Sequence, residues 1–203
     1  MAYRRTPAVQ ARLDASREAI LKAAIALLTE HGYPGCSVAA VAARAGVATG
    51  TVYRHFPNKA QLVTEVFRFA AGRELAAVTE AVRRPAAVAD RIIALIETFA
   101  GRAFKSPRLA YALLAEPVDP AVDAERLVFR RGYRDLVAAA VAGGVASGAL
   151  PAQNPEVTAA ALVGAMAEAL VSPLAAGHAE VDTIPSLITF ALRAVGGSDA
   201  RDA

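Results

Sequence analysis

The chain has 203 residues, 55% of them hydrophobic and 20% charged, with a net charge of +3. This length is enough for one or two folded units that bury a core without disulfide bonds. The single cysteine, Cys36, excludes an intramolecular disulfide framework and agrees with a reducing cytoplasm. The basic N-terminus is not followed by an apolar run, so no signal peptide is expected.

The charge is distributed unevenly along the chain. Residues 1–60 contain eight Lys and Arg against three Asp and Glu, a net charge of +5, which leaves −2 for the remainder. A positively charged N-terminal part is what binding to phosphate groups requires.

Abundant alanine and apolar residues at helical spacing predict an all-α protein of about nine helices. Residues 1–13 are expected to form a flexible basic arm, which either orders against DNA or remains a solvated tail. A first helix is expected from residue 14 or 16 to 31, where Gly32 ends it. The predicted helices that follow cover residues 38–45, 49–56, 59–83, 85–105, 108–115, 121–147, 156–174 and 184–195.

The stretch 37–59 reads as two short helices joined by a tight turn. Ser37 is a good N-cap for the first helix, and Gly46 can end it in the left-handed conformation. Val52 and Phe56, four residues apart, would face the core and leave the other side chains of the second helix exposed. Such a pair is either a DNA-binding helix-turn-helix or an ordinary hairpin of helices.

The residue types suit the DNA-binding alternative. Gly50 lets the backbone approach DNA closely, and Arg54 can bind guanine with two hydrogen bonds. Tyr53, His55 and Lys59 can reach phosphate oxygens.

The sequence GVATGTVYRHFPNK at residues 46–59 resembles the recognition-helix signature of the TetR (tetracycline-repressor) family of bacterial transcriptional regulators. The resemblance implies an N-terminal three-helix DNA-binding domain and a C-terminal helical domain for ligand binding and dimerisation. The boundaries expected are 1–13 for the arm, 14–60 for the DNA-binding domain and 61–203 for the second domain. The positions that match the family's DNA contacts are Ser37, Arg44, Thr49, Gly50, Thr51, Tyr53, Arg54, His55 and Lys59.

Three positions depart from the family pattern. Ala48 stands where many members have a serine cap, and Ala39 and Ala40 stand where polar residues are common. Alanine side chains form no hydrogen bonds, so the start of the second helix of the motif should carry more of the specificity.

The helix expected over 59–83 begins beside the DNA reader and ends in a different core, which makes it the mechanical link between the domains. In the family this helix moves when ligand binds. The expected pocket residues are Phe67, Phe99, Phe104, Tyr111, Leu114, Phe129, Tyr133 and Met166. Polar anchors are expected among Glu97, Arg102, Arg130 and Glu168, and the mostly apolar lining favours a lipophilic or aromatic ligand.

The helices expected over 156–174 and 184–195 are apolar on more than one face, which favours an interface. In the family the last two helices pair with their copies in a homodimer. The interface residues expected are Leu162, Val163, Met166, Leu170, Leu187 and Phe190. The stretch 157–179 is apolar enough to raise the possibility of a membrane span, but Glu168 near its centre favours a buried helix.

The function predicted is a cytoplasmic repressor that binds a palindromic DNA operator as a homodimer and is released by a small molecule. The alternative is a DNA-binding regulator with no small-molecule ligand, which a core without a cavity would favour. An enzyme is not expected, because His31, His55 and His178 show neither metal-ligand nor Ser-His-Asp spacing. No metal or cofactor is expected.

Overall fold

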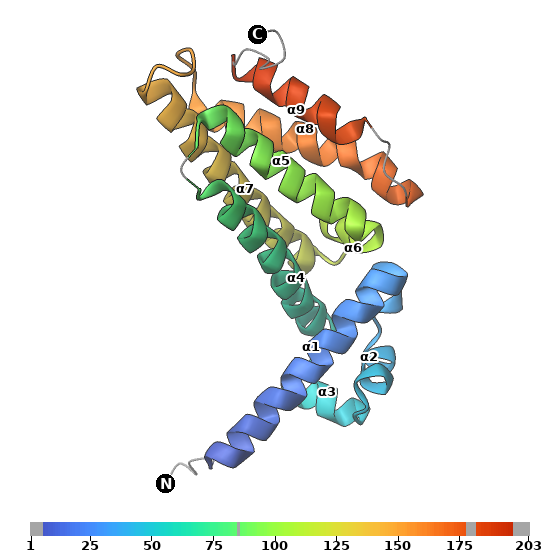
Figure 1. Ribbon diagram of the computed structural model, residues 1–203. Helices are drawn as coiled ribbons and strands as arrows, with labels where there is room; N and C mark the ends of the chain where they lie inside the picture. Colours follow the sequence, from blue (N-terminus) through green and yellow to red (C-terminus); the bar gives the residue numbers. More distant parts are fainter. Residues whose placement is uncertain (1–5, 85, 178–181, 197–203) are drawn as a thin grey trace.

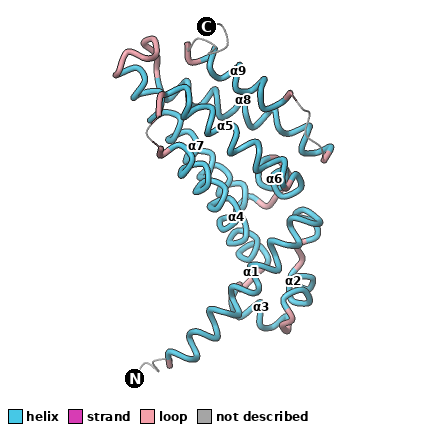
Figure 2. The backbone as a smooth tube through the Cα atoms, viewed as in Figure 1, coloured by secondary structure: helices cyan, strands magenta, loops and turns pink. Residues whose placement is uncertain are grey.

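The computed structural model describes residues 6–84, 86–177 and 182–196. Over these residues the chain is all-α, with nine helices and no strand (Figures 1 and 2). Helices α1–α3 form a small head near the N-terminus, and α4 runs from this head into a bundle made with α5–α9 (Figure 1). The expected all-α architecture is confirmed.

Helix α1 spans Pro7–Gly35 and begins earlier than expected. Proline is favourable at the start of a helix because it lacks the N–H that would go unpaired there. The Gln10 amide donates a 2.9 Å hydrogen bond to Asp14, one turn on, which supports the first turns. The flexible arm predicted for residues 1–13 is therefore helical from Pro7 onward, and its residues 1–5 lie outside the described part of the chain.

Helices α2, Val38–Ala45, and α3, Thr49–His55, form the predicted helix-turn-helix. The Ser37 hydroxyl accepts the N–H of Ala40 at 3.2 Å and caps α2. Gly46 ends α2 with φ of 66°, and the next residue, Val47, donates its N–H to the Ala42 carbonyl at 3.0 Å. These contacts close the helix as a left-handed glycine normally does.

The remaining helices lie within three residues of their expected ends. They are α4 Lys59–Val82, α5 Val88–Lys105, α6 Pro107–Leu114, α7 Pro120–Ala146, α8 Pro155–Ala176 and α9 Thr183–Ala194. The Asn58 side chain caps α4 by accepting the Gln61 N–H at 2.9 Å.

Two hydrophobic cores hold these helices. The first joins α1–α3 to the N-terminal half of α4, through buried residues such as Ile20, Val52 and Val66, and to α6 and the start of α7. The second joins the C-terminal part of α4, from Val78, to α5, α7, α8 and α9. The first core extends along α4 as far as Ala71, so the packing crosses the domain boundary expected at residue 60. Helix α4 is a member of both cores.

Gly46→Ala tests the turn of the helix-turn-helix. A Cβ at position 46 would contact no atom within 4 Å, so the cost is the left-handed backbone alone. We expect a loss of about 1 kcal/mol in the free energy of unfolding, measured by urea denaturation. The control is Gly101→Ala, in a helical segment of α5 with equally open space, which should be neutral or stabilising by up to about 1 kcal/mol. Equal effects at the two positions would contradict this account.

Candidate nucleic-acid interface and ligand cavity

Helix α3 has one face in the core and the other in solvent. Val52 and Phe56 are 0% and 2% exposed, whereas Tyr53 is 49% exposed. Thr49 and Gly50, at the start of the helix, are also exposed. The packing of Val52 and Phe56 therefore turns the predicted base-contacting side outward. The remaining exposed positions predicted to contact DNA are Ser37, Arg44, Arg54 and Lys59, and Thr51 is half-buried.

Two of the positively charged side chains predicted to contact DNA already have partners within the chain. The Arg44 guanidinium forms two hydrogen bonds with the Glu30 carboxylate, at 2.8 and 2.5 Å, and this pairing raises the pKa of Arg44. The Lys59 ammonium lies 4.9 Å from the centre of the Tyr33 ring. A phosphate would have to share Arg44 with Glu30, whereas Lys59 is positioned by the ring and keeps its N–H donors.

His55 does not bring a positive charge to this surface. Its Nε2 is buried and has no hydrogen-bond partner. Burial lowers the pKa of His55, and the positive charges of Arg17 and Arg54 lower it further. The imidazole is therefore neutral at pH 7, and a phosphate contact through Nε2 would require the side chain to move.

Charged side chains connect the head to the bundle in a continuous chain. Arg17 of α1 pairs with Glu65 of α4 at 2.7 Å, and Arg68 pairs with Glu65 at 2.9 Å and with Glu125 of α7 at 2.6 Å. Arg17 also lies 5.3 Å from the centre of the Phe56 ring at the end of α3. This network holds α1, α3, α4 and α7 together along one side of the joint.

A second joint holds the end of α1 against the loop between α6 and α7, and we call it the Tyr33 clasp. The backbone N–H of Tyr33 donates to the Glu116 carboxylate at 2.9 Å, and the Tyr33 hydroxyl donates to Asp119. Gly32 makes room for it: with φ of +69°, a Cβ there would lie 2.7 Å from a Glu116 carboxylate oxygen. Arg126 of α7 fixes the other side of the loop by donating to the carbonyls of Leu113 at 2.9 Å and Glu116 at 2.8 Å.

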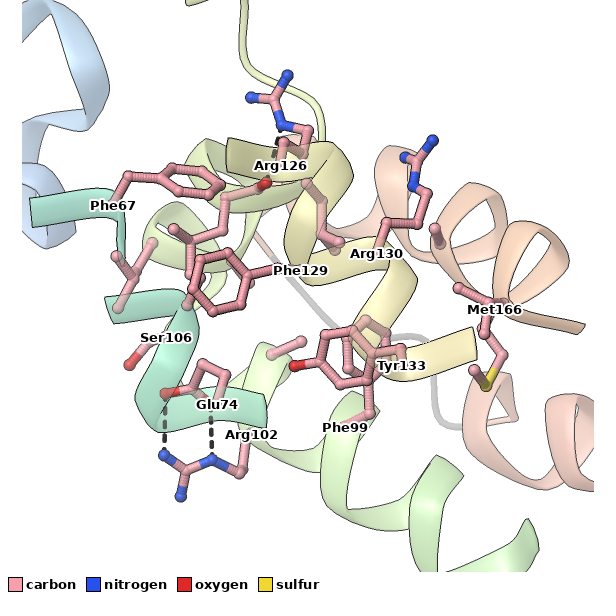
Figure 3. Close-up of a pocket in the computed structure, with 18 of the residues that line it drawn as sticks. Phe67, Glu74, Phe99, Arg102, Ser106, Arg126, Phe129, Arg130, Tyr133 and Met166 are labelled. Carbon is pink, nitrogen blue, oxygen red and sulfur yellow. Dashed lines mark hydrogen bonds and ion pairs between the residues drawn. The ribbon is translucent and has the colours of Figure 1, made fainter. Parts of the chain in front are cut away.

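The bundle contains a mostly apolar cavity of about 300 Å³ between α4, α5, α6, α7 and α8 (Figure 3). Phe67 and Phe129 lie on one side of it, and Phe99, Tyr133 and Met166 lie together on another. The other lining residues are Ala71, Glu74, Arg102, Ala103, Lys105, Ser106, Leu109, Ala110, Leu113, Leu114, Arg126, Arg130, Val163 and Ala167. The cavity is therefore enclosed by both helices, α4 and α6, that contact the head.

The polar side chains that line the cavity differ in whether a partner within the chain already neutralises their charge. Glu74 accepts two hydrogen bonds from Arg102, at 2.6 and 2.9 Å, so this pair offers little net charge. Burial and the nearby Glu74 charge raise the pKa of Tyr133, which keeps its hydroxyl neutral. Lys105 and Arg130 are exposed and have no ion-pair partner among the described residues. The free positive charge of the lining thus comes from these two side chains.

The structure brings together six of the eight expected pocket residues: Phe67, Phe99, Leu114, Phe129, Tyr133 and Met166. Phe104 and Tyr111 pack against the second core instead and do not line the cavity. Of the expected polar anchors, Arg102 and Arg130 line it, whereas Glu97 and Glu168 are exposed elsewhere.

Comparison with known proteins agrees with the helix-turn-helix. Residues 20–66 match the family model for bacterial regulatory proteins of the tetR family. An uncharacterised HTH-type transcriptional regulator of Mycobacterium tuberculosis is 32% identical over 145 residues, 71% of this chain and 64% of that one. The repressor KstR of Rhodococcus jostii is 49% identical over 47 residues, 23% of this chain and 22% of KstR. The chain belongs to the TetR family.

Other relatives match over part of their length. The fatty acid metabolism regulator protein of Bacillus subtilis is 30% identical over 77 residues, 38% of this chain and 40% of that protein. The first curated relatives are thus matched over less than half their length. The fold extends further: FadR of Bacillus halodurans has a TM-score of 0.76 at 19% identity, over 93% of this chain and 96% of that one. FadR of B. subtilis, solved with stearoyl-CoA, has a TM-score of 0.75 at 19% identity, over 90% and 99%.

The expected interface residues need correction in this TetR-family chain. Leu162, Val163, Met166, Leu170 and Leu187 are all at most 7% exposed, because they pack against α5, α6 and α7 within the same chain. Of the six, Phe190 alone is exposed, at 50%. Helix α8 is long and apolar enough to cross a membrane, yet these residues place one side of it in the second core.

Cys36 and the possible metal ligands of the described residues were candidates for other chemistry. Cys36 is fully buried, and burial raises the pKa of its thiol to about 11, so the reactive thiolate is absent at neutral pH. No group of three His, Cys, Asp or Glu that could hold a metal ion occurs in the described part of the chain. His178 lies outside it.

Sequence reasoning missed several residues that the structure places at the site. Glu74, Lys105, Ser106 and Arg126 line the cavity, and Tyr33, Glu116 and Asp119 form the clasp. The two partners of Tyr33 lie 83 and 86 residues away in the sequence. No local pattern marks such a pair.

Lys59→Ala and Arg54→Ala separate phosphate contacts from base contacts. We expect Lys59→Ala to weaken binding to all duplexes and to lower the slope of log affinity against log salt by about one. Arg54→Ala should change the sequence preference, costing about 1–3 kcal/mol at one base pair. Fluorescence anisotropy over a range of salt concentrations measures both effects.

The matched control is Arg84→Ala, which removes the same charge from the far end of the bundle, beyond α4. It should leave the salt slope unchanged. If Arg54→Ala left the preference intact and lowered the slope instead, Arg54 would be a phosphate contact.

Proposed function

We propose that this protein is a cytoplasmic transcriptional repressor that binds a palindromic operator as a homodimer and is released by a lipophilic small molecule. The observation that carries the proposal is the course of α4. Its N-terminus follows α3 after three residues, and Phe67, Ala71 and Glu74 along its length line the cavity. A ligand that changes the cavity therefore acts on the element that supports the reader.

Dimerisation explains how a recognition helix as short as α3 could bind its operator tightly. Two readers held about 34 Å apart contact successive major grooves of a palindrome. The face proposed for dimerisation is the exposed side of α8 and α9, with Val157 64% and Phe190 50% exposed. Ala161 and Gly164 on the exposed side of α8 are small, which allows close approach of a partner helix.

The nature of the ligand is suggested by the lining and by a relative. Apolar and aromatic side chains dominate the cavity, and Lys105 and Arg130 supply unpaired positive charge beside it. These features suit an apolar molecule with an anionic group. FadR of B. subtilis, which shares the fold, was solved with stearoyl-CoA. We therefore propose a fatty acyl compound as the ligand class.

The alternative functions have less support. A DNA-binding regulator without a ligand would be favoured by a bundle without a cavity, and this bundle has one of about 300 Å³. An enzyme is disfavoured because the matched relatives are regulators of transcription.

The test begins by selecting the operator from random duplexes with purified full-length protein. Free fatty acids and acyl-CoA thioesters are then titrated into the DNA complex, and binding is followed by anisotropy. We expect release, with operator affinity lowered about 5- to 150-fold, and an equal loss of ligand affinity on the DNA-bound protein. If compounds bind by calorimetry yet leave operator affinity unchanged, the switch is wrong. Failure to select any duplex would refute the repressor itself.

The Tyr33 clasp should contribute to the coupling between the two sites. Replacing Glu116 and Asp119 together by alanine removes both acceptors of Tyr33. Neither residue lines the cavity, so we expect ligand affinity of the free protein to stay within about twofold, while the ligand-induced loss of operator affinity falls severalfold.

Glu80→Ala serves as the control, because Glu80 is exposed and its described partner, Arg83, is at the end of α4 away from the head. It should leave the coupling intact. A double variant with the same coupling as the unaltered protein would show that α4 alone transmits the signal.

A further inference from the structure

A second cavity of about 150 Å³ lies farther along the bundle, beside the first half of α5 and the later part of α7. With the exception of Arg91, every residue that lines it is apolar, and it is bounded by Ile92 and Leu95 of α5, Leu136 and Ala140 of α7 and Leu162 of α8. Like the first cavity, it is formed by α5, α7 and α8. We call the first cavity, which is nearer the head, the outer chamber and this one the inner chamber.

The two chambers follow each other along the same helices. On α5 the outer chamber touches Phe99 and Ala103, and the inner one touches Ile96, less than one turn before. On α7, Tyr133 lines the outer chamber, and Leu136, three residues later, lines the inner one. Helices α5 and α7 run in opposite directions (Figure 1). The order of the two chambers along the bundle is therefore the same whichever helix is followed.

Met166 lines both chambers and is therefore part of the wall between them. Phe99 and Tyr133 complete this partition on the outer side, with ring centres 5.2 Å apart and planes at 71°. Figure 3 shows all three side chains together. The aromatic pair is a stiff edge-to-face contact, whereas methionine has a flexible, unbranched side chain that adapts to its surroundings. Met166 is therefore the flexible member of this partition.

We propose that the chambers form one channel for an unbranched acyl chain, with Met166 as a movable partition, so that the inner chamber makes binding depend on chain length. This inference rests on the proposed function and specifies its ligand. The anionic head would lie near Lys105 and Arg130, the unpaired cations of the outer chamber. The head is either a free carboxylate or the phosphates of an acyl conjugate, and the shared chemistry is a straight chain with a negative end.

The energetic reason is burial of methylene groups. Each CH₂ transferred from water to an apolar site is expected to raise affinity about fourfold. The affinity of an acyl chain that reaches past Met166 continues to rise with its length. The affinity of one confined to the outer chamber stops rising once that chamber is full. Chain length therefore selects the ligand without any further polar contact.

The test measures affinity by calorimetry for straight-chain compounds of about eight to about eighteen carbons, as free acids in one series and CoA thioesters in another. Ala140→Leu fills part of the inner chamber, and Ala110→Leu, the matched control, fills part of the outer one. We expect Ala140→Leu to weaken the longest chains about tenfold or more and to leave the shortest within about twofold. Ala110→Leu should weaken every length.

Met166→Phe provides a second, independent variant. A stiff ring at this position would close the partition, so affinity should stop rising at the same acyl-chain length as in Ala140→Leu. Circular dichroism and operator binding without ligand verify that each variant is folded. The channel is refuted if Ala140→Leu weakens all lengths equally or none. If no compound of either series binds the unaltered protein, the ligand class is wrong and the channel with it. If compounds bind with the expected length dependence but leave DNA bound, the channel stands and the release mechanism fails.

Discussion

The architecture depends on the burial of one helix in two separate cores. Val66 of α4 is packed with the DNA-reading head, and Val78, three turns later, is packed with the bundle. Close-packed interiors resist small displacements, so a shift of α4 at one end cannot be absorbed in the middle of a continuous helix. In the proposed switch, ligand and DNA would therefore act on the same rigid body.

The head is held by more than α4, because α1 also packs against α6 within the first core. The Tyr33 clasp and the Arg17–Glu65–Arg68–Glu125 chain of ion pairs also hold the head against the bundle. The ion pairs are largely exposed, and each contributes little alone. Together with the Tyr33 clasp, these ion pairs fix the angle at which α3 projects from the rest of the molecule. Helices α4 and α6 both line the cavity, so each of the main supports of the head borders the space a ligand would occupy.

The extent to which the sequence predicts this structure follows from the range of the interactions. Ser37, Gly46 and Asn58 act on backbone groups within a few residues, and the helix ends they define were predicted closely. The early start of α1 at Pro7 was not predicted, because this basic stretch lacks strong apolar periodicity. Its helical structure depends on the proline at the helix start and on local side-chain pairs, which apolar spacing does not reveal. Apolar residues of α8 could face a partner or the chain's own core, and periodicity alone cannot decide which. Leu170 proves to be fully buried. The Tyr33 clasp and the partition at Met166 are formed by side chains that are distant in sequence. No local sequence pattern therefore predicts them.

The pairing of Arg44 with Glu30 has a consequence for how the protein searches a genome. A cation already held by a carboxylate displaces fewer counterions from DNA than its formal charge suggests. Arg17, held by Glu65, is similarly restrained. Contacts with arbitrary sequence are weakened more than contacts that also use base edges, because only the latter have another source of free energy. In the proposed repressor, internal neutralisation of the head would shorten its stay at non-operator sites and leave more molecules free to find the operator.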